Sequence, residues 1–261
     1  MVTTRASQLT KQSNGLQARP AIGKFGLGVI GLALLLTGCQ AVPFSPAVNP
    51  PAQADQPRLE VGDTWIYRHT DGFTKLPRGA FTHTIIAISG DAVTVQVKAE
   101  NGGIVATDRY TRGWNWLEHP MTNIQRFSYD PPYAAFQFPL TVDQSWSQYT
   151  HATDTVTSKT YNLARVDGKV SGWQRVTVPA GAFDAIFVRR TAFSGAPTFE
   201  RSQEYITEDD WYAPAVNNVV VGSYRSLYKD KTQNGDEGGN SGWYDNDWTL
   251  VELVEYRPAR K

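Results

Sequence analysis

The chain has 261 residues, with 25 Lys or Arg, 25 Asp or Glu, and a single Cys. One cysteine excludes an internal disulfide, so the folded part must rely on its own hydrophobic core. The first 38 residues hold four basic and no acidic side chains. The rest therefore has 21 basic and 25 acidic residues, and this charge of −4 argues against nucleic acid or anionic lipid head groups as partners.

The first 38 residues have the pattern of a secretory signal peptide. Residues 1–24 are basic, and Phe25–Leu36 is an uninterrupted run of apolar residues and glycine. This run is too short for a membrane-spanning helix, which needs about 20 residues. The small residues Thr37 and Gly38 then precede Cys39, as expected at a cleavage point.

The sequence Leu36-Thr37-Gly38-Cys39 resembles the lipobox of bacterial lipoproteins. The resemblance implies that the Cys39 thiol carries a diacylglyceryl group, that residues 1–38 are removed, and that a fatty acid such as palmitate acylates the new N-terminus. Several acyl chains on one residue would hold the protein in a membrane. In a cell with two membranes, Gln40 in place of Asp implies the outer membrane facing the periplasm rather than the inner membrane.

Residues 39–58 follow the leader and contain five prolines among Ala, Gln and Val. Such a stretch favours extended geometry and offers little to bury, so we predict a spacer between the lipidated cysteine and the folded part. Residues 59–261 are then expected to form a single β domain.

Alternation of apolar and polar residues is frequent after residue 59, as in Val93, Val95 and Val97. No window shows a sustained 3.6-residue apolar stripe, so we expect strands and little helix. The predicted strands are Thr64–His69, Ala80–Ile88, Val93–Val97, Ile104–Thr111, Ser145–Thr150, Thr155–Arg165, Trp173–Val178, Ala182–Thr191, Val219–Tyr228 and Thr249–Tyr256. Glycine-containing turns are expected at 89–91, 101–103 and 167–168.

The turn Val178-Pro179-Ala180-Gly181 should join two of these strands as a hairpin. Proline suits the second position of a type I turn, and Gly181 can adopt the positive φ that closes it. We read this turn as a structural element and not as a site.

Two segments share the pattern Val-x-x-(Ser/Thr)-Trp, namely Val61–Trp65 and Val142–Trp146, and each opens a run of strands. This weak repeat indicates two similar β-meanders, although two unrelated tryptophans at strand starts would give the same pattern. Strands without helices between them imply antiparallel pairing. The fold expected is an antiparallel open barrel (half-barrel or clam) or a β-sandwich.

Four segments together resemble uncharacterised secreted bacterial β-proteins, which are distantly similar to the open half-barrels of lipoprotein carriers. They are Val61–Tyr67, Phe138–Trp146, Val176–Ile186 and Trp211–Pro214. The resemblance spans most of residues 59–228 and implies fold more than function. The chain has Asp143 and Asn217-Asn218 where the pattern has glycine, and both residue types tolerate positive φ.

The segment Tyr129–Leu140 combines aromatic residues with prolines that should keep it irregular. Its aromatic side chains could form core, or they could act as a flap that lines a groove for an apolar ligand. The candidate groove residues are Tyr133, Phe136 and Phe138.

Polar residues give weaker signals. Asp230, Asn234 and Asp236 imitate the first half of a calcium loop, but Ser241 stands where the bidentate Glu is needed, and a solvated loop explains the segment equally. The four histidines lack metal-ligand spacing. We therefore expect no metal, no cofactor and no catalytic residue set.

These observations predict a membrane-anchored envelope lipoprotein that is not an enzyme and binds an apolar ligand or an envelope protein. The alternatives are a structural or assembly component of an envelope complex, and a hydrolase acting on envelope polymers. An internal cavity would favour ligand binding, and a flat exposed apolar patch would favour a protein partner.

Overall fold

The computed structural model describes residues 44–120, 126–158, 160–195, 201–230 and 242–260. In these ranges the chain forms β-strands and one 3-10 turn, η1 (Pro214–Val216). The strands are β1 (Phe44–Pro46), β2 (Gln53–Ala54), β3 (Thr64–Asp71), β4 (Pro77–Ser89), β5 (Ala92–Ala99), β6 (Ile104–Thr111), β7 (Trp116–Pro120), β8 (Arg126–Tyr133), β9 (Leu140–Thr141), β10 (Ser145–Asp154), β11 (Thr160–Val178), β12 (Gly181–Gly195), β13 (Arg201–Ala213), β14 (Asn218–Asp230) and β15 (Tyr244–Arg257).

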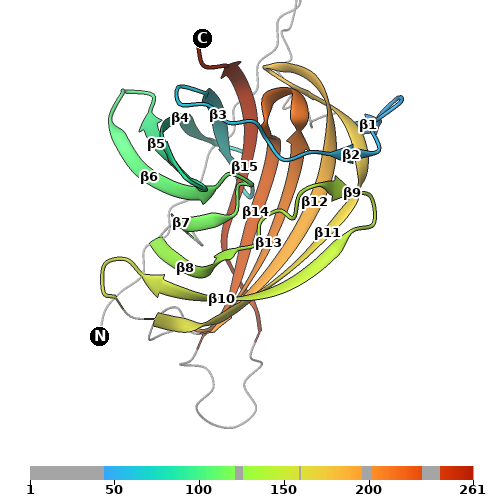
Figure 1. Cartoon of the computed structure of the whole chain (residues 1–261). Coiled ribbons are helices and arrows are strands. Elements are labelled where there is room, and N and C mark those ends of the chain that lie inside the picture. Colours follow the sequence, from blue (N-terminus) through green and yellow to red (C-terminus); the bar gives the residue numbers. More distant parts are fainter. Residues whose placement is uncertain (1–43, 121–125, 159, 196–200, 231–241, 261) are drawn as a thin grey trace, which may run out of the picture. The chain divides into compact units, whose positions relative to one another are not determined.

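Twelve of the described strands form a closed antiparallel barrel (Figure 1). They run from β3 to β15 in chain order, with β9 outside the circle, and each pairs with the next. The last strand, β15, then pairs antiparallel with the first, from Thr249 opposite Asp71 to Arg257 opposite Thr64. An even number of strands in an up-and-down order lets the two ends of the meander pair antiparallel.

The expectation of a mainly β, antiparallel fold with little helix is therefore confirmed. The open half-barrel and the β-sandwich are both wrong, because the pairing of β15 with β3 leaves no open edge between the first and last strands of the meander. Closure of this kind also removes unpaired strand edges, at which other chains could add.

The two Val-x-x-(Ser/Thr)-Trp segments each open one half of the barrel, β3–β8 and β10–β15. In the first, Gly62 N donates to Ile85 O (2.8 Å) and Ile85 N to Asp63 O (3.0 Å). In the second, Asp143 N donates to Val170 O (3.0 Å), and Val170 N donates back to Gln144 O (2.9 Å). Both halves thus begin with the same hydrogen-bonded turn.

The predicted tolerance of positive φ at the two departures from glycine is confirmed. Asp143 has φ 67° and Asn217 has φ 55°. Asp143 occupies the place that Gly62, with φ 104°, occupies in the first half. Asp and Asn adopt this region more readily than other non-glycine residues, so the turns survive without glycine.

The described part of the predicted spacer, residues 44–58, packs on the barrel. Phe44–Pro46 pairs with β11 and Gln53–Ala54 pairs with β9. Ala54 and Pro57 are buried, and the Phe44 ring stacks on Trp211 with 4.6 Å between centroids. The prolines give an extended chain, as expected, but this chain is not free: β1 joins the edge of the large sheet, and β2 forms a separate two-stranded sheet with β9.

A chain that begins at Leu59 should therefore be less stable than one that begins at Gln40, by about 1–3 kcal/mol, because the shorter chain loses the buried Ala54 and Pro57. Urea unfolding of both chains measures the difference. Val48→Ala in the longer chain is the control and should change nothing, since Val48 is 80% exposed. Equal stability of the two chains would contradict this assignment.

The predicted hairpin at residues 178–181 is present. Val178 pairs with Gly181 across a two-residue turn, and Gly181 has φ 133°. An L side chain is strained at this φ, so glycine is required here by the backbone.

Gly181→Val should lower the free energy of unfolding by about 1–2 kcal/mol, because a β-branched side chain is strained at positive φ. Ala182→Val, one residue along the same hairpin and exposed, is the matched control and should be neutral. Denaturant midpoints of the two variants give the comparison, and an unchanged midpoint for Gly181→Val would refute the role assigned to this glycine.

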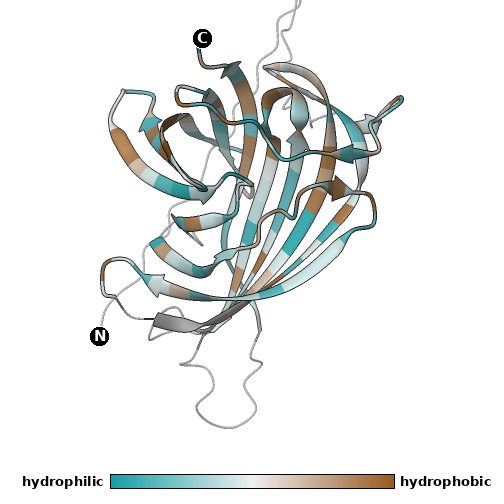
Figure 2. Cartoon of the chain, in the orientation of Figure 1, coloured by the Kyte–Doolittle hydropathy of each residue, from teal (hydrophilic) through white to brown (hydrophobic). Residues whose placement is uncertain are grey.

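Hydrophobic and polar residues alternate along many strands of the barrel, as the brown and teal bands in Figure 2 show. The inner faces bury a core of Trp, Tyr, Val, Ile and Ala side chains that includes Trp65, Ile85 and Val188. Several inner positions are polar or charged instead, and these lie around the cavity described next.

Candidate functional site

A cavity of about 600 Å³ lies inside the barrel. Its lining comes from strands β3–β8 and β12–β15, from Trp114 between β6 and β7, and from Phe136 in the segment that follows β8. The volume is in the range of small-molecule sites. Since the lining residues belong to strands far apart in the chain, closure of the barrel is what assembles the site.

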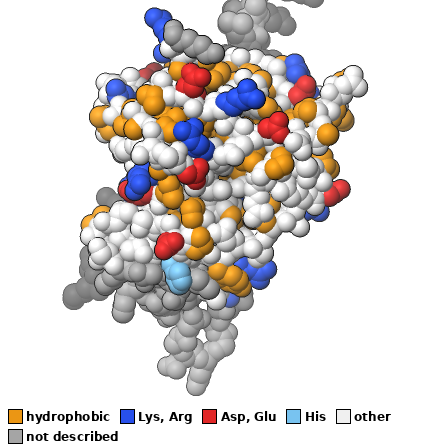
Figure 3. Space-filling view, in the orientation of Figure 1, with side chains coloured by type: hydrophobic (Ala, Val, Ile, Leu, Met, Phe, Trp, Pro, Cys, Tyr) orange, Lys and Arg blue, Asp and Glu red, His pale blue; other side chains and the backbone are white. Residues whose placement is uncertain are grey.

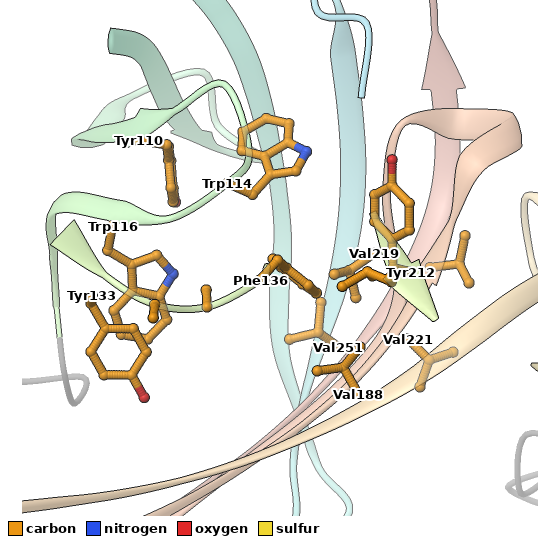
Figure 4. Close-up of a cluster of buried hydrophobic side chains, with 14 of the residues drawn as sticks. Tyr110, Trp114, Trp116, Tyr133, Phe136, Val188, Tyr212, Val219, Val221 and Val251 are labelled. Atoms are coloured by element: carbon orange, nitrogen blue, oxygen red, sulfur yellow. The ribbon is translucent and has the colours of Figure 1, made fainter. Parts of the chain in front are cut away.

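One side of the cavity is an aromatic wall. It consists of Trp65, Tyr67, Tyr110, Trp114, Trp116 and Phe136. Trp114 lies edge-on to both Trp65 and Tyr110, at 5.6 and 5.3 Å between centroids. Figure 4 shows Tyr110, Trp114 and Trp116 grouped on one side of Phe136, with Tyr212 on the other.

The polar atoms of three side chains in this wall already donate hydrogen bonds to backbone carbonyl oxygens. Trp65 Nε1 donates to Val216 O, Trp114 Nε1 donates to Asn217 O, and the Tyr67 hydroxyl donates to Val219 O, each at 2.8 Å. A ligand therefore meets the carbon surfaces of these rings. Burial raises the pKa of Tyr67 well above its usual value, so its hydroxyl stays protonated as a donor.

An inner charged cluster, formed by Arg190, Glu208 and Asp210, lines another part of the cavity. The guanidinium lies 2.8 Å from Glu208 Oε2 and 2.6 Å from Asp210 Oδ2, and all three side chains are at most 3% exposed. The hydroxyls of Tyr133 and Tyr224 donate to Glu208 (2.8 Å) and Asp210 (2.7 Å). These bonds satisfy the charged groups that the barrel buries.

Protonated tyrosines hold this cluster together. Burial, and secondarily the charges of Glu208 and Asp210, raises the pKa of Tyr133 and Tyr224 well above the usual value. Both hydroxyls thus remain donors at any physiological pH.

A second ionic group lies on the other wall, where Arg126 Nη1 is 2.7 Å from Asp108 Oδ1. Arg126 Nη2 also lies 3.7 Å from Glu118. Asp108 is buried and Arg126 is partly exposed. Asp108 lines the cavity, whereas Glu118 is partly exposed and lies outside the lining.

Three of the four histidines, His69, His83 and His119, line the cavity, and His151 is exposed on β10. Burial lowers the pKa of His69 and His83 to about 4, so both rings are neutral at pH 7. The Nε2 atom of His83 is buried and has no hydrogen-bond partner in the described structure. Such an atom in a polar cavity is available to a ligand or to water.

The three predicted groove residues separate in the structure. Phe136 lines the cavity and is 4% exposed. Tyr133 is fully buried, stacks on Trp116 at 4.1 Å between centroids, and belongs to the core (Figure 4). Phe138 is partly buried and packs on Tyr212 at 5.0 Å. Arg126–Tyr133 is strand β8, so only the later part of Tyr129–Leu140 is irregular as predicted.

The other predicted site residues lie at the margin of the described structure. Cys39, Asn234 and Asp236 fall outside the described residues, and Asp230 is the last residue of β14. Among the residues that are described, no group of three or more His, Cys, Asp or Glu could hold a metal ion. The same residues contain no helix long and apolar enough to cross a membrane.

Sequence reasoning missed the charged residues of the cavity. Glu208 and Asp210 stand two residues apart on β13 and so share its inner face, together with Ile206. The spacing was visible in the sequence, but an inner face that carries acids does not show the apolar alternation by which strands are recognised.

No protein-family model matches the chain, and no curated protein matches it significantly. Three solved structures match it at low identity. A predicted lipoprotein from Parabacteroides distasonis has a TM-score of 0.42 at 16% identity, over 78% of this chain and 97% of its own. A predicted exported protein with a YmcC-like fold from Bacteroides fragilis has a TM-score of 0.41 at 12% identity, over 78% and 99%.

The third structure, the hypothetical lipoprotein YmcC from Escherichia coli, has a TM-score of 0.41 at 10% identity, over 77% of this chain and 86% of its own. With TM-scores below 0.5, none of the three assigns a function to this chain.

Proposed function

We propose that the protein is a lipoprotein of the cell envelope that binds a small molecule with a large apolar part inside its barrel, and that it catalyses no reaction. The observation that supports this most directly is the cavity of about 600 Å³ with its aromatic wall. Pockets lined by hydrophobic and aromatic side chains, with polar groups at fixed places, are typical of small-molecule sites.

The surface gives less support to a protein partner. On the face shown in Figure 3, hydrophobic side chains occur in small groups separated by charged and polar ones, with Lys or Arg often beside Asp or Glu. Binding surfaces for proteins more often present a contiguous apolar patch. The internal cavity, together with the mixed character of this one face, favours a ligand over a partner.

A neutral dye whose fluorescence rises in apolar surroundings, such as Nile red, tests for the cavity. We expect the folded protein to bind it, and Ala106→Phe to weaken binding at least tenfold, because Ala106 lines the cavity and a phenyl ring there occupies part of its volume. Thr107→Phe is the matched control, since Thr107 is exposed on the same strand, and it should bind like the wild type.

Thermal unfolding of both variants must show that they fold. Absence of dye binding to the wild type, or equal binding by the two Phe variants, would contradict the proposal. The assembly-component hypothesis would then take its place.

The anchor is the second part of the proposal and rests on the signal sequence and Cys39. Intact-mass analysis of the protein from its host should show loss of residues 1–38 and added acyl groups. Cys39→Ala should leave an unlipidated precursor that is poorly processed. A mature protein with a free Cys39 thiol would contradict the anchor and leave the cavity unaffected.

A further inference from the structure

The charges that surround the cavity are unequal. In the inner charged cluster, one arginine, Arg190, faces two carboxylates, Glu208 and Asp210. The lining as a whole contains four carboxylates, Asp108, Glu208, Asp210 and Asp247, and three guanidinium groups, Arg126, Arg190 and Arg225. The hydroxyls of Tyr133 and Tyr224 stabilise the carboxylates of the inner cluster but carry no charge. The lining therefore has an excess of negative charge, and the electrostatic potential inside the cavity is negative.

Each arginine that lines the cavity has a carboxylate partner. Arg126 pairs with Asp108, Arg190 with Glu208, and Arg225 with Asp245, whose carboxylate lies 2.7 Å from Arg225 Nη2. In the described lining, therefore, each guanidinium is already engaged. An anionic ligand would have to displace a carboxylate, which leaves a buried charge unpaired.

The aromatic wall adds to the same preference. Ring faces carry negative electrostatic potential and attract cations within about 6 Å of the centroid. Phe136 already contacts one cation in this way, since the Arg190 guanidinium carbon lies 5.1 Å from its ring centroid. The rings of Trp65, Tyr67 and Tyr110 present further carbon surface to the cavity.

The unpartnered Nε2 of His83 is a second, independent feature. Its ring lies edge-to-face with Tyr67 at 5.2 Å between centroids. Asp108 and His119 face this ring from β6 and β7, and His69 from β3. A neutral imidazole nitrogen accepts a hydrogen bond from a donor such as an ammonium N–H.

We infer that the ligand of this cavity is a cationic amphiphile, in which a protonated amine is attached to an apolar body. The amine would lie near the carboxylates of the two ionic groups and His83, and the apolar part would lie against the aromatic wall. This inference rests on the proposed function and adds the charge of the ligand to it.

Three small molecules of matched size separate the possibilities, each tested for displacement of Nile red at pH 7.5. They are 4-phenylbutylammonium, 4-phenylbutan-1-ol and 5-phenylpentanoate. We expect the ammonium to bind at least about tenfold more tightly than the carboxylate, with the alcohol between them.

If the three displace the dye equally, or the carboxylate does so best, the charge preference is wrong and the proposed function stands. If the dye binds and none of the three displaces it, the inference also fails. If the wild type binds no dye at all, the proposed function itself fails.

Three substitutions on β13 locate the charge effect. Glu208→Gln and Asp210→Asn each remove one negative charge from the inner face, and both should weaken binding of the ammonium about tenfold and leave the alcohol unchanged. Asp209→Asn removes the same charge from the outer face, where Asp209 pairs with Arg189, and should change neither.

Should the inner variants fail to fold, Asp108→Asn on β6 tests the opposite wall in the same way, because its partner Arg126 is partly exposed. Equal loss of ammonium and alcohol binding in a folded variant would show a change of shape rather than of charge, and would overturn the inference.

Discussion

Arg190→Met should lower the free energy of unfolding by about 3–5 kcal/mol. Arg190 is 1% exposed and is the shared cation of Glu208 and Asp210. Methionine keeps most of the volume but leaves two carboxylates buried without their cation, and removal of one partner of a buried ion pair has a cost of this size.

Denaturant unfolding at pH 7.5 measures this loss. The neighbouring Arg189→Met is the matched control, because Arg189 is exposed on the outer face and its ion pair with Asp209 should contribute about 0–1 kcal/mol. Adding Glu208→Gln and Asp210→Asn to Arg190→Met should recover part of the stability. Equal effects of the two arginine substitutions would contradict the role of the inner charged cluster.

The protein should lose stability as the pH falls from 6.5 towards 4. His69 and His83 have pKa values lowered to about 4 by burial, compared with about 6.5 in the unfolded chain. Between these values the unfolded chain binds more protons than the folded one, so the free energy of unfolding decreases as the pH falls. From pH 7.5 to 5.0, each histidine should contribute a loss of about 2 kcal/mol.

Unfolding curves of His83→Gln at pH 7.5 and pH 5.0 isolate one of these contributions. The loss between the two pH values should be about 2 kcal/mol smaller in this variant than in the wild type. His151→Gln, at an exposed position on β10, is the matched control. A pH dependence that His83→Gln leaves unchanged would show that His83 is not buried in its neutral form.

Strands with apolar inner faces were predictable from the sequence. β5 alternates Val93, Val95 and Val97 on its inner face with polar residues outside, and its place was predicted. β13 was missed because its inner face carries Glu204, Glu208 and Asp210, so that neither face shows an apolar series.

The turn predicted at Asp167-Gly168 is wrong, and the reason is a contact between strands. β11 continues through both residues to Val178. A Cβ atom on Gly168 would lie 2.1 Å from the indole of Trp146 on the neighbouring strand, so glycine is needed there to admit the tryptophan. A glycine that signals a turn in the sequence can thus mark a place where a large ring covers a strand.

The cavity was the least predictable feature. Three histidines line the cavity, namely His69, His83 and His119, and their spacing in the sequence does not indicate a common site. They line the same cavity because β3, β4 and β7 lie on the same side of the closed barrel. Closure of the barrel depends on the pairing of β15 with β3, and no local sequence pattern predicts a pairing between strands so far apart in the chain. Of the groove residues predicted from aromatic content, only Phe136 reaches the cavity.

Native mass spectrometry of the protein purified from its own host tests most directly whether the barrel holds a small molecule. The wild type should carry a noncovalent adduct that is released on denaturation, in addition to the covalent acyl groups, and Ala106→Phe should carry less of it or none. A wild-type mass equal to that of the lipidated chain alone, or an adduct that Ala106→Phe retains in full, would contradict binding in this cavity.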